Sequence, residues 1–94
     1  MQKKKNLLSK ELEIVNELGL HARSASQIAL LAQKATDRVW LQKGTAKVDA
    51  TSILDILTLG CPKGSKIIIF VEHYNDINVL NDIAGLIENG FGEL

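Results

Sequence analysis

A histidine and an arginine stand two residues apart in the run Leu18-Gly19-Leu20-His21-Ala22-Arg23-Ser24-Ala25-Ser26. A polar loop ends here and a segment with apolar residues at helical spacing begins, so the sequence predicts His21 at a helix N-terminus. Unpaired backbone N–H groups and the helix dipole stabilise an anion there, phosphate included. The dipole also favours the neutral, nucleophilic imidazole, and Arg23 can balance a phosphoryl charge. These residues predict a phosphohistidine site.

The elements that must position His21 can be predicted from hydrophobic periodicity. Alternation predicts strands at 11–14, 38–42, 46–48 and 65–72, the last being apolar on both faces and therefore central in its sheet. Apolar residues at i, i+3, i+4 and i+7 predict helices at 22–35, 53–57 and 77–87. The order is βαββαβα. The fold class is therefore α+β, with one four-stranded sheet and three helices on one face.

Caps and turns support these boundaries. Ser52 and Asp55 have capping-box spacing before the second helix, and Gly60 stops that helix. Asn75 or Asp76 is expected to cap the third helix, and Gly90 to follow its last turn. Gly85 interrupts the pattern of the third helix at a cost of about 1 kcal/mol relative to alanine. A close contact is therefore expected at Gly85.

Length and composition bound the function. Ninety-four residues make one small domain: we expect a flexible leader at 1–9 and a single domain at 10–94. Lys plus Arg and Asp plus Glu number 11 each, and this zero net charge argues against a nucleic-acid binder. Trp40 is expected to cover a face of the sheet, because the second aromatic residue that a base-stacking platform needs is not expected beside it. The leader's Lys3-Lys4-Lys5 tract is interpreted as a solvated terminus.

Cysteine usage and hydropathy suggest the compartment. Cys61 is the only cysteine, which excludes an internal disulfide and fits a reducing cytoplasm. Apolar runs fall well short of the roughly 18 residues of a membrane span. Two histidines and one cysteine make a metal site improbable, and nothing in the sequence calls for a cofactor. We therefore expect a cytoplasmic protein without metal or cofactor.

The run Gly19-Leu20-His21-Ala22-Arg23 resembles the active-site signature of the HPr family, the histidine phosphocarriers of the bacterial phosphoenolpyruvate:sugar phosphotransferase system. The resemblance extends to residues 51–60, which are similar to the family's second helix, and to 61–65, which are similar to the turn into its last strand. It covers residues 10–92 without obvious gaps and implies the family's open-faced sandwich with an antiparallel sheet. Residues 87–92 are also similar to the nitrogen-regulatory branch.

The resemblance implies a carrier that is modified and regenerated, not an enzyme. His21 would accept a phosphoryl group from phosphorylated Enzyme I, at Nδ1 by the family's habit, and pass it to an EIIA-type acceptor. Arg23 and the backbone N–H groups of residues 22–24 would hold the phosphoryl oxygens. Ser24 stands where the family typically has proline, so its hydroxyl and N–H could contact the phosphoryl group or loosen the site. The carrier is expected to be a monomer that binds neither nucleic acid nor membrane.

Two further sites follow from the resemblance, each beside a simpler interpretation. Ser52 would be a regulatory phosphorylation site for an HPr kinase/phosphorylase, or only an N-cap. Leu54, Ile56 and Leu57 exceed what one apolar stripe requires, so they could form a partner-docking patch or belong to the core.

Two other function classes stay open. One is an HPr-like regulatory protein with weak or lost phosphotransfer, which Ser24 would favour. The other is a ferredoxin-like small-molecule sensor, which shares the element order but gives no reason for the His21–Arg23 pair. The sequence leaves the downstream acceptor and the transported sugar open.

Overall fold

Within the described part of the chain, four strands and three α-helices follow one another in the predicted order βαββαβα. The computed structural model describes residues 8–93. The strands are β1 (Ser9–Glu13), β2 (Val39–Lys43), β3 (Ala46–Asp49) and β4 (Lys66–Val71). The helices are α1 (Ala22–Ala32), α2 (Ile53–Thr58) and α3 (Ile77–Glu88), with single 3₁₀ turns at Tyr74–Asp76 and Gly90–Gly92.

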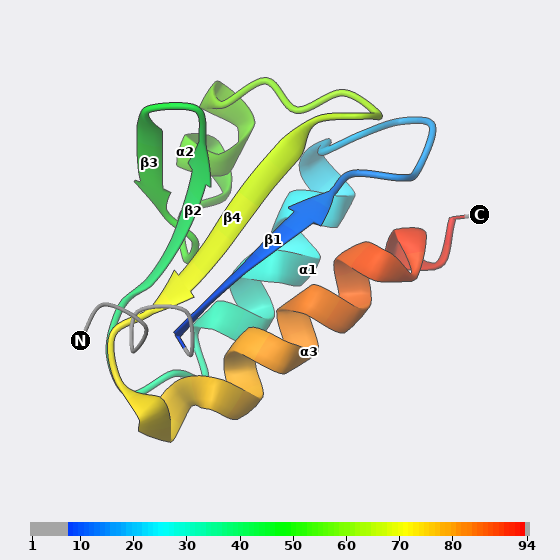
Figure 1. The fold of residues 1–94 in the computed structure, drawn as a ribbon. Coiled ribbons are helices and arrows are strands. Elements are labelled where there is room, and N and C mark those ends of the chain that lie inside the picture. The colour runs from blue at the N-terminus through cyan, green and yellow to red at the C-terminus, as the bar shows by residue number, and fades with distance from the viewer. Residues whose placement is uncertain (1–7, 94) are drawn as a thin grey trace.

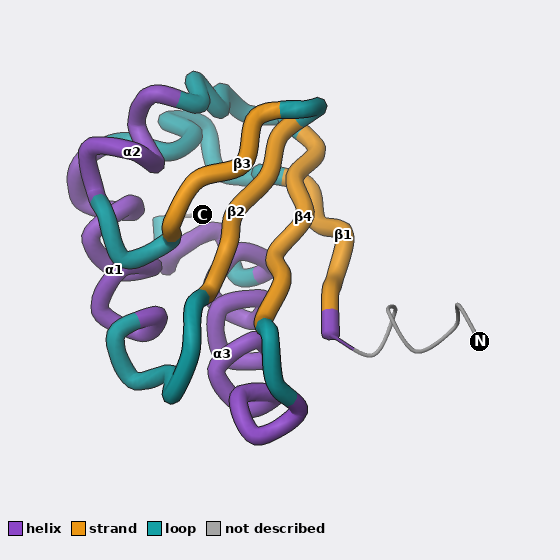
Figure 2. Tube along the Cα trace, turned by 90° about the vertical axis from the view of Figure 1, so that its left-hand side faces the viewer, coloured by secondary structure: helices purple, strands orange, loops and turns teal. Residues whose placement is uncertain are grey.

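The sheet is fully antiparallel, with the strand order β1-β4-β2-β3. β4 is central, as its apolar composition predicted: it pairs with β1 along one edge and with β2 along the other, its inward residues are buried, and Ile68 and Phe70 on its outer face are half-buried. The ribbon in Figure 1 and the turned tube in Figure 2 show the three helices gathered on one face of this sheet. The predicted open-faced sandwich is confirmed.

The core lies between the sheet and the helices. The inward residues of β2 and β4 alternate along each strand and meet the apolar stripes of α1 and α3. The largest fully buried side chains include Ile14, Ile28, Leu41, Ile69 and Ile83. Burial of such a side chain contributes roughly 1.5–3 kcal/mol, so this layer fixes where the first turn of α1 stands relative to the sheet.

Strand β1 begins earlier than the alternation pattern indicated. Ser9 pairs with Phe70 of β4, and Leu8 packs against the core. The expectation that the flexible leader extends to residue 9 was therefore wrong for Leu8 and Ser9, which belong to the folded domain. Backbone pairing, which leaves no hydrophobic signature at Ser9, extends the strand. The lysine tract and the other residues of the expected leader, 1–7, lie outside the described residues.

Two local expectations need correction. Gly85 is exposed, and a Cβ built on it would meet nothing within 4 Å, so no close contact requires this glycine. Asp76 stands at the N-cap position of α3 but makes no capping hydrogen bond. Its buried carboxylate instead accepts hydrogen bonds from the backbone N–H groups of Thr36 at 2.8 Å and Asp37 at 2.9 Å, and so ties the α1–β2 connection to the start of α3.

The outer face of the sheet carries Trp40, as expected. Phe70 is its partner in the β2–β4 register, so a second aromatic is present on this face after all. The Nζ atom of Lys47 lies 4.8 Å from the Trp40 ring centroid, and the indole N–H donates to Glu72. Cation–π contact and hydrogen bonding therefore account for the half-buried indole.

Candidate functional site

His21 is the N-cap residue of α1, as the sequence predicted. Its backbone is extended (φ −125°, ψ −176°), and the helix begins at the next residue. The loop before it is held by a hydrogen bond from the Gly19 N–H to the Asn16 carbonyl and by one from the Leu20 N–H to the Cys61 carbonyl at 2.8 Å. The imidazole remains 27% exposed, so another protein can reach it.

Ser24 is fully buried at the third position of α1. Its Oγ accepts a hydrogen bond from the backbone N–H of His21 at 2.9 Å. The carbonyls of Gly19 and His21 lie 3.2 Å from the same Oγ, within reach of the Ser24 hydroxyl proton. The hydroxyl therefore fastens the His21 backbone to the helix start, which is the part that the third residue, usually Glu or Gln, plays in a capping box. Its contact with a phosphoryl group stays a prediction.

Arg23 lies in the same helical turn with an exposed side chain. Its Nη2 atom is 3.9 Å from the Glu93 carboxylate, a distance that leaves the guanidinium weakly held. The first N–H groups of any α-helix have no partner inside the helix, and those of α1 begin directly after His21. A phosphoryl group at this helix start would meet both the guanidinium and the N–H groups.

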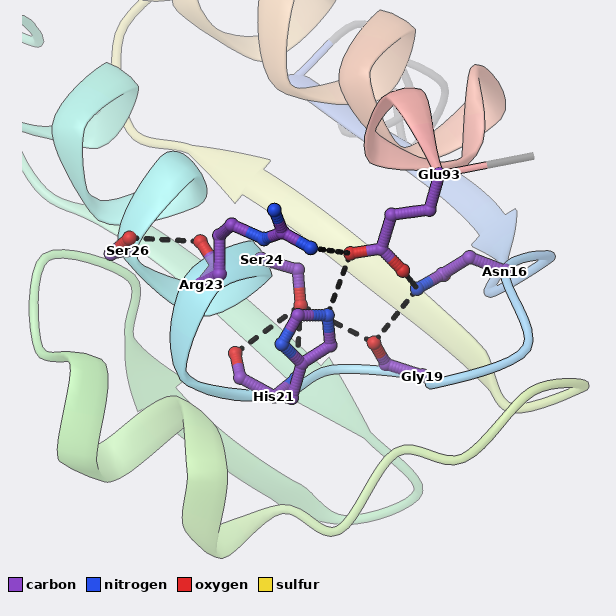
Figure 3. A network of polar contacts seen from close by, with 7 residues as sticks. All are labelled: Asn16, Gly19, His21, Arg23, Ser24, Ser26 and Glu93. Carbon is purple, nitrogen blue, oxygen red and sulfur yellow. Dashed lines mark hydrogen bonds and ion pairs between the residues drawn. The ribbon is translucent and has the colours of Figure 1, made fainter.

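Glu93 and Asn16 complete the site, and neither was singled out from the sequence as a site residue. The Glu93 Oε2 atom lies 2.6 Å from His21 Nε2, and its Oε1 accepts a hydrogen bond from Asn16 Nδ2 at 2.9 Å (Figure 3). Asn16 is fully buried and donates from the same Nδ2 to the Gly19 carbonyl at 2.9 Å. The sequence offered one signal for Asn16, namely a polar residue in the loop that leads to His21. It offered none for Glu93, which is separated from His21 by 72 positions.

The carboxylate of Glu93 is held in its ionised form. The hydrogen bond from Asn16 lowers the pKa of Glu93, and the contacts with His21 and Arg23 lower it further, against a smaller rise caused by desolvation. A negative charge therefore stands on one side of the His21 ring at neutral pH. The site therefore brings together the imidazole of His21, the carboxylate of Glu93 and the guanidinium of Arg23.

Several large apolar side chains are exposed on α1, on α2 and in the loop before His21. Leu54 is 75% exposed and Ile53 is 38% exposed on α2, and Leu18 and Leu30 are also exposed. Leu57 is half-buried against the core. Ile56 is fully buried, so its expected part in partner docking was wrong, because it faces the core from the opposite side of the helix. Ile53, rather than Ile56, is therefore exposed on α2 together with Leu54.

Ser52 is the N-cap of α2, and its Oγ accepts a hydrogen bond from the Asp55 N–H at 3.2 Å. The capping interpretation of Ser52 is confirmed, and its phosphorylation stays a prediction. Cys61 is buried, as expected, and burial raises the pKa of its thiol against the opposing effect of the Lys43 charge.

Within residues 8–93, no cluster of His, Cys, Asp and Glu side chains has the arrangement of a metal site. Over the same residues, none of the helices has the length and hydropathy needed to cross a membrane.

A family model described as "PTS HPr component phosphorylation site" matches residues 8–89. The chain belongs to the HPr family. This assignment agrees with the resemblance noted in the sequence and favours a phosphocarrier of the phosphotransferase system. A ferredoxin-like sensor shares only the order of helices and strands with this chain.

Relatives named as phosphocarriers match the HPr domain over nearly its whole length. "Phosphocarrier protein HPr" of Neisseria meningitidis serogroup A is 30% identical over 93% of this chain and 98% of the relative. "Phosphocarrier protein NPr" of Shewanella violacea is 31% identical over 92% of this chain and 94% of the relative. The two names differ while the identities are nearly equal, so identity does not separate the HPr and NPr groups.

Solved structures share the fold. A crystal structure of HPr-C-His from Thermoanaerobacter tengcongensis superposes with a TM-score of 0.86 at 34% identity, covering 92% of this chain and 97% of that one. A structure described as an HPr dimer from the same organism has a TM-score of 0.72 at 35% identity, covering 87% of this chain and 94% of that one.

Proposed function

We propose that His21 carries the phosphoryl group of this HPr-family protein, receiving it from phosphorylated Enzyme I and passing it to an EIIA-type acceptor. The observation that carries the proposal is the place of His21: a partly exposed imidazole at the N-terminus of α1, in the same turn as Arg23. A loose phosphoryl-transfer transition state needs positioning and charge balance above all, and both are available here.

Arg23 has the freedom that this role requires. Its side chain is 70% exposed and the Glu93 carboxylate lies 3.9 Å away, so the guanidinium can turn toward a phosphoryl group without breaking a buried contact. The planar fork of arginine suits phosphate oxygens better than a lysine would. The N–H groups at the start of α1 then supply fixed donors for the remaining oxygens.

Docking of Enzyme I and of the acceptor is assigned to the apolar surface made by Leu18, Leu30, Ile53 and Leu54. Its exposed α2 residues stand on the helix that packs against α1, so a partner that covers them also reaches His21. A carrier that meets several partners in turn is expected to be a cytoplasmic monomer, although a structural relative is described as a dimer. Ser52 phosphorylation by an HPr kinase would be seen as a gain of one phosphate in intact mass.

The decisive experiment is phosphotransfer from labelled phosphoenolpyruvate in the presence of Mg²⁺ and a bacterial Enzyme I. The wild type is expected to gain an acid-labile, base-stable phosphate. His21→Ala should take no label, whereas His73→Ala, which removes the exposed histidine near Asp37, should be labelled like the wild type. An unlabelled wild type with active cognate Enzyme I would overturn the carrier role and favour a regulatory binding protein.

A further inference from the structure

The chain after α3 is built to bring Glu93 to His21. Gly90, Phe91 and Gly92 have φ angles of 63°, 58° and 75°, so three successive residues are left-handed. A non-glycine residue pays roughly 1–2 kcal/mol for this conformation. The Phe91 side chain is 95% buried, since its exposed fraction is 5%, and this burial offsets the cost and anchors the turn. The buried Phe91 thus fixes the turn that places Glu93 beside His21.

Two separate donors then fix the Glu93 carboxylate. Asn16 Nδ2 holds Oε1 at 2.9 Å, and His21 Nε2 lies 2.6 Å from Oε2. Asn16 is itself fully buried and tied to the Gly19 carbonyl, so the oxygen that faces the histidine is placed by a rigid neighbour. The Glu93 side chain is 14% exposed, so bulk water competes little for this contact.

The contact determines where the imidazole proton resides. An ionised carboxylate only accepts hydrogen bonds, so a 2.6 Å contact between Oε2 and Nε2 requires a proton on Nε2. A neutral imidazole carries one proton, and with that proton on Nε2 the lone pair is on Nδ1.

We propose that Glu93 is a positioning residue for phosphotransfer: it holds His21 in the Nε2–H tautomer and so selects Nδ1 as the nucleophile. The role rests on the proposed function of His21. Glu93 would orient the ring as a carboxylate orients a catalytic or metal-binding histidine elsewhere.

The transfer step balances without a further reagent. The Nδ1 lone pair of His21 forms a bond to phosphorus while the N–P bond of the donor phosphohistidine breaks, and that bonding pair returns to the donor nitrogen. The donor ring, protonated on its other nitrogen, leaves as neutral imidazole. His21 keeps its Nε2 proton, so its ring gains positive charge as the new bond forms. That charge develops beside the Glu93 carboxylate, which stabilises it.

Glu93→Gln tests the role with little change in shape. Asn16 and His21 contact different oxygens of the carboxylate, and an amide replaces one of these oxygens with an NH₂ group that only donates, so one of the two contacts loses its acceptor. Glu88→Gln is the matched control, because it removes the same charge from an exposed position at the end of α3.

The primary measurement is the tautomer of His21 from ¹⁵N chemical shifts and two-bond ¹H–¹⁵N couplings in imidazole-labelled protein at neutral pH. The wild type and Glu88→Gln are expected to show a protonated Nε2 and an unprotonated Nδ1. Glu93→Gln should show a mixture of tautomers. His73, which the same spectrum reports, should be unchanged in both variants.

The second measurement is phosphotransfer from Enzyme I. Glu93→Gln should lower the maximal rate of phosphotransfer about tenfold, with little change in KM for the phosphorylated donor. Loss of a group that hydrogen-bonds a functional histidine typically costs about 10–100-fold, and the expected effect is at the lower end of that range. A wild type that takes phosphate while Glu93→Gln alters neither tautomer nor rate would overturn the role of Glu93. A wild type that takes none would overturn the proposed function instead, and the tautomer spectra tell the two failures apart.

Discussion

The backbone of Gly19, two residues before His21, lies against the backbone of Cys61. A Cβ atom on Gly19 would lie 2.4 Å from the Cys61 carbonyl oxygen and 2.8 Å from the Pro62 Cα atom. The residue also has φ +67°, in the left-handed region that favours glycine. Because the next N–H, that of Leu20, donates to the same Cys61 carbonyl, this contact ties the loop before His21 to the connection between α2 and β4.

Gly19→Ala should therefore cost stability and distort the site. The left-handed strain and the backbone clash together should lower the free energy of unfolding by about 3 kcal/mol, measured by urea denaturation. Gly44→Ala is the control, since Gly44 has φ +60° with open space around it, and should cost only about 1 kcal/mol. Equal losses in the two variants would show that the contact with Cys61 contributes nothing.

The sequence predicted the fold well because local patterns and burial agree in most elements. Alternation and helical spacing place β4 and the apolar stripes of α1 and α3, and the glycine-rich turns mark their ends. The errors occur where backbone geometry or a distant partner decides. Ser9 joins β1 through backbone pairing alone, and Ile56 turns inward although its neighbours Leu54 and Ile53 are exposed.

The site was only half predictable for the same reason. His21, Arg23 and Ser24 lie in one helical turn, so their proximity follows from local structure. Glu93 reaches His21 only after the left-handed turn that follows α3, and no periodicity in the sequence encodes a contact across 72 positions. Long-range polar contacts of this kind require the assembled fold.

Ser24 is expected to stabilise the N-terminus of α1 through its hydroxyl. Ser24→Ala removes the acceptor of the His21 N–H and should lower the free energy of unfolding by about 1 kcal/mol. It should also slow phosphotransfer, because the His21 backbone loses its tie. Ser26→Ala, whose hydroxyl donates to the Arg23 carbonyl on the helix surface, should change both quantities much less. Thermal unfolding and Enzyme I-dependent labelling measure the two effects; indistinguishable variants would contradict this role of Ser24.

Asp76 is expected to contribute acid-sensitive stability. The hydrogen bond from the Thr36 N–H, together with that from the Asp37 N–H, lowers the pKa of Asp76, against the rise caused by desolvation. The folded state thus binds this proton less readily than the unfolded state. The contribution is present above the unfolded pKa of about 3.9 and is lost as pH falls through the lower folded value.

Asp76→Asn should therefore lower the free energy of unfolding at pH 7 by about 1–2 kcal/mol and reduce its decline between pH 5 and 2.5. Asp82→Asn, at an exposed position of α3, should keep the wild-type pH dependence. Urea denaturation across this range tests the prediction, which fails if all three proteins lose stability in parallel.

Leu54 is expected to contribute to docking rather than to folding. Its side chain is 75% exposed, so Leu54→Asp should leave the free energy of unfolding within about 0.5 kcal/mol of the wild type. The same change places a charge within the proposed docking surface and should raise KM for phosphorylated Enzyme I about tenfold, or 1.4 kcal/mol. Tyr74→Asp is the control, because Tyr74 is 65% exposed but lies before α3, at the opposite end of that helix from Glu93. An unchanged KM for Leu54→Asp would move the docking surface away from α2, toward Leu18 and the loop that precedes His21.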